Sequence, residues 1–131
     1  HRVLKKELNE TMDKLVGIFR NAQDLQAALG KVKTLKERFN RLAPPQSGLK
    51  FNYDILTHLE LEANIDVAEA VIVGALKREE SRGSHSRRDF LTRNDKDFLK
   101  HTLAYYRAKG DVDIQYKPVT ITKYQPEERK Y

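Results

Sequence analysis

A histidine and a glutamate with metal-ligand spacing are the first residues in the chain suited to chemistry. His58 and Glu62 lie four positions apart, so a helix presents both side chains on one face, as two ligands of one ion require. A metal site needs a third ligand, and nothing in the sequence assigns His85 or His101 to that place. We therefore interpret His58 and Glu62 as surface residues and predict no metal site.

Nucleophilic and cofactor chemistry lacks the residues that it needs. Ser84 and Ser86 flank His85, but no Gly-x-Ser-x-Gly turn occurs and no carboxylate is placed to orient the imidazole. Cysteine is absent, and the six glycines never cluster into a phosphate-binding loop. The sequence therefore predicts no catalytic residue and no cofactor-binding residue in this segment.

A basic cluster is the strongest remaining signal. Arg82, Arg87, Arg88 and Arg93 lie within twelve positions and are opposed only by Asp89. One interpretation is an arm that pairs with carboxylates of another domain. The others are a solvated basic loop and a surface that contacts the phosphates of a nucleic acid. We favour the docking arm, because a nucleic-acid surface more often spreads over a helix or sheet with exposed aromatic side chains.

The charge of the whole chain is concentrated in the same region. The 131 residues carry a net charge of +6. Residues 1–80 have 13 basic and 12 acidic side chains, a net of +1, and residues 81–131 have 12 and 7, a net of +5. The length suits one domain, and no apolar run approaches the ~20 residues of a membrane-spanning helix. We predict one structural domain with two parts, residues 1–80 and 81–131, and no insertion into a membrane.

The elements that position the cluster begin with three helices. One helix is predicted from the candidate N-cap Asn21 to Leu42, because its apolar residues are spaced alternately three and four positions apart. Pro44-Pro45 then ends it. A third helix is predicted from near Asn52 to about Glu80. The first helix is predicted from an apolar stripe near the start of the chain: Leu4, Leu8, Met12, Leu15 and Phe19. Short links between these segments predict an antiparallel three-helix bundle.

The third helix should be the central one, and strands should follow it. Residues 67–76 are apolar except for Glu69, which predicts a helix covered on more than one side. Residues 81–95 have no period and form an extended arm. Residues 103–106 and the alternating residues 112–116, joined by a turn at 109–111, predict a β-hairpin. We predict one more short strand at 119–124 and a loosely held tail at 125–131.

Three motifs carry a resemblance to a known family. They are Asp66-Val67-Ala68-Glu69-Ala70, Glu80-Ser81-Arg82-Gly83-Ser84-His85-Ser86-Arg87-Arg88-Asp89 and Leu99-Lys100-His101-Thr102-Leu103. With these motifs the chain resembles the C-terminal region of the flavoprotein subunit of succinate dehydrogenase and fumarate reductase. A stretch near the start, residues 12–20, also resembles the family's pattern M-x-x-x-V-G-I-x-R. Where the family commonly has a proline and then x-Arg-Asp-Asp, this chain has Leu91-Thr92-Arg93-Asn94-Asp95.

The resemblance implies a mainly α fold, a spectrin-repeat-like bundle followed by the arm and a small hairpin. It implies a parent subunit that interconverts succinate and fumarate through FAD, while this segment holds no cofactor and is not an enzyme alone. The implied partners are the flavin-binding domain of the same subunit and an iron–sulfur subunit, in a cytoplasmic complex peripheral to the membrane. The implied interdomain contacts are Arg82, Gly83, His85, Arg87 and Asp89.

Two alternatives remain open at this point. The first is that the chain is a free-standing basic module that binds RNA or an acidic partner. The second is that it is the equivalent region of L-aspartate oxidase, whose family shares the Ser-Arg-Gly-x-His block that begins here at Ser81.

Overall fold

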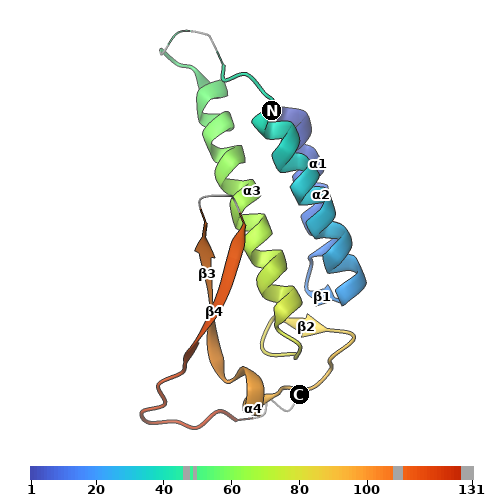
Figure 1. Ribbon diagram of the computed structural model, residues 1–131, viewed down its shortest axis with the longest axis vertical. Coiled ribbons are helices and arrows are strands. Elements are labelled where there is room, and N and C mark those ends of the chain that lie inside the picture. Colours follow the sequence, from blue (N-terminus) through green and yellow to red (C-terminus); the bar gives the residue numbers. More distant parts are fainter. Residues whose placement is uncertain (46–47, 49, 108–110, 128–131) are drawn as a thin grey trace.

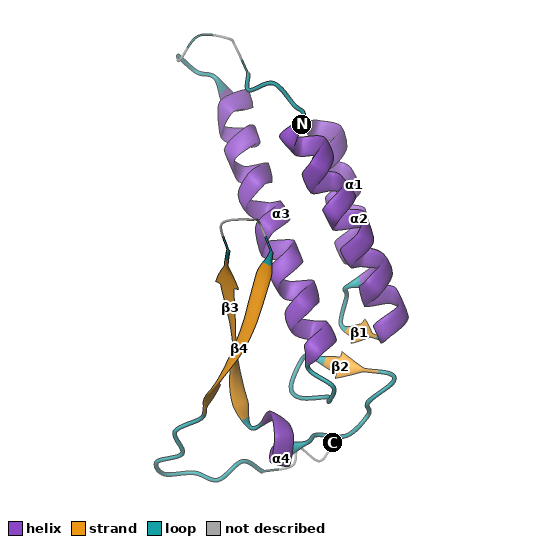
Figure 2. Cartoon of the chain, in the orientation of Figure 1, coloured by secondary structure: helices purple, strands orange, loops and turns teal. Residues whose placement is uncertain are grey.

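The computed structural model describes residues 1–45, 48, 50–107 and 111–127. Three long helices lie side by side and alternate in direction, which confirms the predicted antiparallel bundle (Figure 1). A two-stranded hairpin lies along the third helix (Figure 2). In chain order the elements are α1 (Arg2–Leu15), β1 (Phe19–Arg20), α2 (Ala22–Asn40), α3 (Tyr53–Lys77), β2 (Ser86–Arg87), α4 (Asp95–Phe98), β3 (Lys100–Tyr106) and β4 (Val112–Pro118).

Asparagine caps and a proline pair set the ends of the long helices. Asn21 Oδ1 accepts a hydrogen bond from the N–H of Asp24 at 2.8 Å, which confirms the predicted cap of α2. Asn52 caps α3 in the same way, accepting from the N–H of Asp54 at 3.1 Å. α2 ends before Pro44-Pro45, as predicted. Residues 46–47 of the predicted connection lie outside the described residues.

Apolar side chains of the three helices form one core. Each fully buried Leu or Ile contributes roughly 1.5–3 kcal/mol. The prediction for Phe19 was wrong: α1 ends at Leu15, the chain turns at Gly17, and Phe19 lies in β1 with 64% of its surface exposed. The core residues are Leu4, Leu8, Val16, Leu25, Ala28, Val32, Leu35, Phe39, Leu61, Ile65, Ala68, Ile72 and Ala75.

α3 is covered on two sides and open along a strip between them. α1 and α2 pack on one side, and the hairpin packs on another, where the side chain of Thr102 faces Gly74 and Ile114 is buried. Between these covers Val67 is 61% exposed and Val71 is 41% exposed. The predicted cover is therefore present but incomplete.

The hairpin is longer than predicted, and the strand expected after it is absent from the described residues. β3 and β4 pair antiparallel from Lys100 opposite Pro118 to Tyr106 opposite Val112. Residues 119–124 are not a strand, because Pro118 has no N–H to continue the ladder and the chain turns away toward α4. Residues 109–110 of the predicted turn and 128–131 of the predicted tail lie outside the described residues.

Candidate docking site

A buried glutamate that the sequence analysis did not single out organises the end of α3. The Glu80 carboxylate accepts hydrogen bonds from Arg78 Nη1 at 2.5 Å, Arg82 Nε at 2.8 Å and the N–H of Asn94 at 2.8 Å. Burial raises the Glu80 pKa, but the bonds from Arg82, Asn94 and Arg78 outweigh it and leave the pKa below its usual value. Glu80 is therefore charged, and it fixes both ends of the arm, residues 81–95.

Arg87 lies inside the molecule and binds the C-terminal end of α3. Only 1% of its surface is exposed. Its Nη1 donates to the Ala75 carbonyl at 2.7 Å, while Nε and Nη2 donate to the two carboxylate oxygens of Asp89, both at 2.7 Å. The last carbonyl groups of a helix lack intrahelical donors and carry partial negative charge. The guanidinium therefore satisfies both the helix end and a carboxylate.

Asp89 extends this contact to a second helix. Its Oδ2 accepts from the N–H of Ala22 at 2.9 Å, at the positive N-terminal end of α2. The hydrogen bonds from Arg87, partly opposed by burial, hold the Asp89 pKa far below its usual range. Nearby, the N–H of Arg88 donates to the Arg20 carbonyl at 2.8 Å, beside the parallel pair β1–β2. The arm thus joins the C-terminal end of α3 to the start of α2.

His85 is held neutral in one tautomer. Its Nε2 lies 3.1 Å from the Arg78 carbonyl, and its Nδ1 lies 3.1 Å from Arg20 Nη1. A carbonyl only accepts and a guanidinium only donates, so Nε2 carries the proton and Nδ1 accepts. Burial is the largest cause that lowers the His85 pKa; the bond to the Arg78 carbonyl opposes it, and the charges of Arg20, Arg87 and Arg78 lower the pKa further.

Gly83 shapes the turn that places His85. Its φ is +59°, a backbone conformation that residues other than glycine rarely adopt. The backbones of Arg82 and His85 pair across it, with N···O distances of 2.8 and 3.0 Å. A Cβ at Gly83 would meet nothing within 4 Å, so its backbone conformation, not close approach, requires glycine.

The structure brings the five predicted contact residues together at one end of the bundle. The side chains of four of them, all except Gly83, make hydrogen bonds within the chain, and the interdomain role of the five residues stays a prediction. The sequence analysis missed Glu80, Arg78 and Arg20 as site residues. The available signal was the charged run that follows the end of the third helix.

An apolar groove of about 380 Å³ lies beside this cluster, along the open strip of α3. Arg20 and His85 line its polar end, and the exposed Val67 and Val71 line its apolar length. Ala104 and Ile114 of the hairpin form the opposite wall. The groove therefore joins an apolar surface to a basic end.

Comparison with known proteins assigns this architecture. Residues 5–131 match the model of the family described as "Fumarate reductase flavoprotein C-term". The chain belongs to this family. The fumarate reductase flavoprotein subunit of Haemophilus influenzae is 41% identical over 128 residues, 98% of this chain and 21% of that protein. The succinate dehydrogenase flavoprotein subunit of Rickettsia conorii is 34% identical, covering 91% of this chain and 20% of that protein.

Solved structures of these flavoproteins share the fold. A chain of Escherichia coli quinol fumarate reductase superposes with a TM-score of 0.92 at 35% identity, covering 97% of this chain and 22% of that chain. Mycobacterium smegmatis Sdh1 superposes with a TM-score of 0.80 at 28% identity, covering 95% and 21%. The chain spans about a fifth of the length of the curated relatives it matches. It is a C-terminal domain of the fumarate reductase and succinate dehydrogenase flavoprotein subunit.

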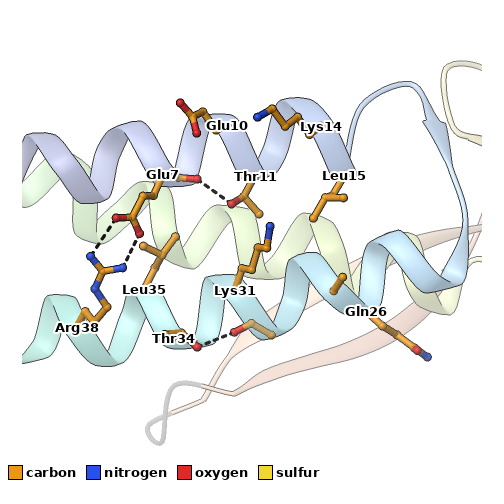
Figure 3. Close-up of a pocket in the computed structure, with 12 residues that line it drawn as sticks. Glu7, Glu10, Thr11, Lys14, Leu15, Gln26, Lys31, Thr34, Leu35 and Arg38 are labelled. Atoms are coloured by element: carbon orange, nitrogen blue, oxygen red, sulfur yellow. Dashed lines mark hydrogen bonds and ion pairs between the residues drawn. The ribbon is translucent and has the colours of Figure 1, made fainter.

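The domain has a second groove, of about 610 Å³, between α1 and α2 (Figure 3). Glu7 and Arg38 face each other across it, with Arg38 Nη2 donating to Glu7 Oε1 at 3.1 Å. The bond from Arg38 lowers the Glu7 pKa. Glu10, Lys14 and Lys31 give the rest of its lining mixed charge. This groove therefore has neither the apolar length nor the single sign of charge found beside α3.

Metal-binding clusters and membrane-spanning helices are both absent from the part of the domain that the structure describes. No group of three or more His, Cys, Asp or Glu side chains is arranged to hold a metal ion there. His58, the candidate ligand of the sequence analysis, instead has its Nδ1 2.8 Å from His1 Nε2. No described helix combines the length and the apolar character needed to cross a membrane.

Proposed function

We propose that this domain docks on the flavin-binding part of a succinate dehydrogenase or fumarate reductase flavoprotein subunit and supplies no catalytic group. The groove along α3 carries the proposal, because Val67 and Val71 expose apolar surface beside a basic end. Contiguous exposed apolar surface of this kind is typical of protein contacts. Membership in a family of C-terminal flavoprotein domains supports the same assignment.

The arm is proposed to shape the rim of this contact. Arg82, His85 and Asp89 keep part of their surface accessible, so they are candidates for direct contacts with the flavin-binding part. Arg87 is buried, and we propose that it acts by positioning Asp89. Gly83 contributes the turn that presents His85.

The two parts of the chain, residues 1–80 and 81–131, are proposed to dock as one unit. Arg78 supports this proposal, because Nη2 donates to the Lys100 carbonyl at 2.6 Å and Nη1 donates to the Phe98 carbonyl at 2.9 Å. These bonds join the end of α3 to the start of β3.

The parent subunit is proposed to transfer a hydride between succinate or fumarate and FAD, and to pass electrons to an iron–sulfur subunit. The described residues do not fit an FAD site. Their parallel strands, β1 and β2, are two residues long, and Gly83, a positive-φ glycine, lies in the arm turn instead of a strand–glycine–helix unit. We therefore assign FAD to the flavin-binding part.

We also propose a cytoplasmic location, peripheral to the membrane through the parent complex.

A binding experiment between the chain and the flavin-binding part tests this proposal. Each piece is first shown by circular dichroism to be folded, and the dissociation constant is then measured by titration calorimetry. The substitution Val67→Glu places a charge in the groove, and we expect it to weaken binding at least about tenfold. Val3→Glu is the matched control, because Val3 is 66% exposed on α1, and we expect less than about a twofold change.

Failure to bind, or equal effects of the two substitutions, would contradict the docking proposal. Flavin retained by the chain alone, or succinate oxidation by the chain alone, would contradict the absence of catalysis. A salt titration with RNA separates the rival function, because a basic RNA-binding module loses affinity steeply as salt rises. Arg82, Arg87 and Arg93 already pair with carboxylates of the same chain, which weighs against their use for phosphate contacts.

A further inference from the structure

We infer that the groove along α3 receives a carboxylate side chain of the flavin-binding part, which pairs with Arg20 while flanking aliphatic residues cover Val67 and Val71. This inference rests on the proposed function and specifies the chemistry of the surface that docks.

The bonding of Arg20 is the first step of the argument. The side chain is half-buried, and its Nε donates to the Gly17 carbonyl at 2.7 Å and the Val16 carbonyl at 3.2 Å. Nη1 donates to His85 Nδ1 at 3.1 Å. All of these acceptors are neutral, and Nη2 has no partner among the residues that the structure describes. The Arg20 guanidinium is therefore held in one orientation by neutral acceptors, without an anionic partner among the described residues.

The neighbouring guanidinium groups are bonded differently. Arg78 pairs with Glu80 at 2.5 Å, and Arg87 pairs with Asp89 at 2.7 Å. Arg20 has no carboxylate within 4.0 Å in residues 1–45, 48, 50–107 and 111–127. Burial lowers the Arg20 pKa, as expected for a charge removed from water without a counter-ion. A charge that is partly removed from water is stabilised by an anionic partner, so an external carboxylate is the expected partner.

The rest of the groove selects a protein segment over a free small anion. Arg20 stands at one end of a groove whose length is formed by Val67, Ala70 and Val71. A small carboxylate would pair with the guanidinium but would leave these apolar side chains in water. An acidic residue with aliphatic neighbours satisfies both, and docking would exclude water and strengthen the ion pair.

The test measures binding of the chain to the flavin-binding part in wild type and three variants. Arg20→Gln removes the charge, and we expect the dissociation constant to rise at least about tenfold. Arg20→Lys keeps the charge but loses the fork, and we expect an intermediate rise. Arg41→Gln is the control for general electrostatics, because Arg41 is exposed at the C-terminal end of α2, away from the arm, and we expect less than about a twofold rise. Added salt should weaken the wild type more than Arg20→Gln.

A charge exchange in the full-length subunit provides the second measurement, which decides the matter if Arg20→Gln fails to fold. Arg20→Glu is combined in turn with lysine at each acidic residue on the docking surface of the flavin-binding part. Restored thermal stability for one combination supports the inference and identifies the carboxylate. Wild-type affinity in Arg20→Gln, or no restoring combination, overturns the inference but leaves docking intact. Absence of wild-type binding overturns the proposed function itself.

Discussion

The bundle is held mainly by apolar packing, and the arm is held mainly by buried charges. The bundle, α1 to α3, encloses a core of aliphatic and aromatic side chains and one buried carboxylate, Glu69 of α3, which pairs with Lys36 of α2 at 2.8 Å. The arm, residues 81–95, has almost no apolar core and is fixed by buried charges, with Glu80 bonded to two arginines and Arg87 bonded to Asp89. Apolar burial tolerates changes in partner, whereas a buried ion requires its partner and its hydrogen bonds together.

The difference teaches how a polar segment obtains a fixed position at the end of a helical bundle. Two helix ends of opposite partial charge, the end of α3 and the start of α2, lie beside each other. The Arg87–Asp89 pair places its cation on the first and its anion on the second. The arm is therefore fixed by the dipoles of the bundle, and its position depends on ionisation more than the packing of the apolar core does.

The largest expected effect is the loss of the buried guanidinium. Arg87→Met keeps an apolar stem but removes the guanidinium donor of the Ala75 carbonyl and the cationic partner of the Asp89 carboxylate. We expect a loss of about 3–5 kcal/mol in the free energy of unfolding, measured by urea denaturation. Arg88→Met is the matched control, and its exposed side chain should change stability by less than about 0.5 kcal/mol. Equal urea midpoints for the two variants would remove the distinction between arm and surface.

The next effect is a cavity in the bundle. Leu61 is fully buried in the core, and Leu61→Ala should cost about 2–5 kcal/mol through lost apolar contacts and the space left behind. We expect the same loss at pH 7 and pH 4, because no ionisable group takes part. A loss that changed with pH would show that Leu61 is energetically coupled to an ionisable group, and the comparison would fail.

The bundle could be predicted because its forces leave a periodic trace in the sequence. The spacing of Leu25, Val32 and Phe39 identified α2, and Asn21 identified its start. Phe19 broke the pattern, because Gly17 ends the helical period before it. Residues 119–124 were wrongly predicted to form a further strand, because Pro118 and the path of the chain toward α4 leave no partner strand.

The site could be predicted only as a set of residues. The resemblance identified Arg82, His85 and Arg87 as site residues. From sequence composition alone, an arginine in a polar loop is expected to be exposed to solvent. Burial of Arg87 depends on the meeting of two helix ends, which are far apart in sequence. The role of Arg20 likewise depends on β1 lying beside β2. Such contacts have no spacing rule, so only the fold shows them.

The smallest and most specific effect is a change in the pH dependence of stability. The Glu80 pKa lies below its usual value in the folded chain, so folding favours the ionised form. The contribution is complete above the unfolded-state pKa, about 4.3, and is lost as the pH falls through the lower folded-state pKa. The wild-type free energy of unfolding should therefore decrease as the pH is lowered from about 5 to 3.

Glu80→Gln should reduce this slope without removing it, because the Asp89 pKa is also lowered and contributes in the same direction. Glu79→Gln is the matched control, since Glu79 is adjacent and exposed, and its curve should run parallel to the wild type. Urea denaturation at a series of pH values gives all three slopes. If Glu80→Gln were as steep as Glu79→Gln, the arm would not owe its position to the ionised Glu80, and apolar packing would have to account for both regions.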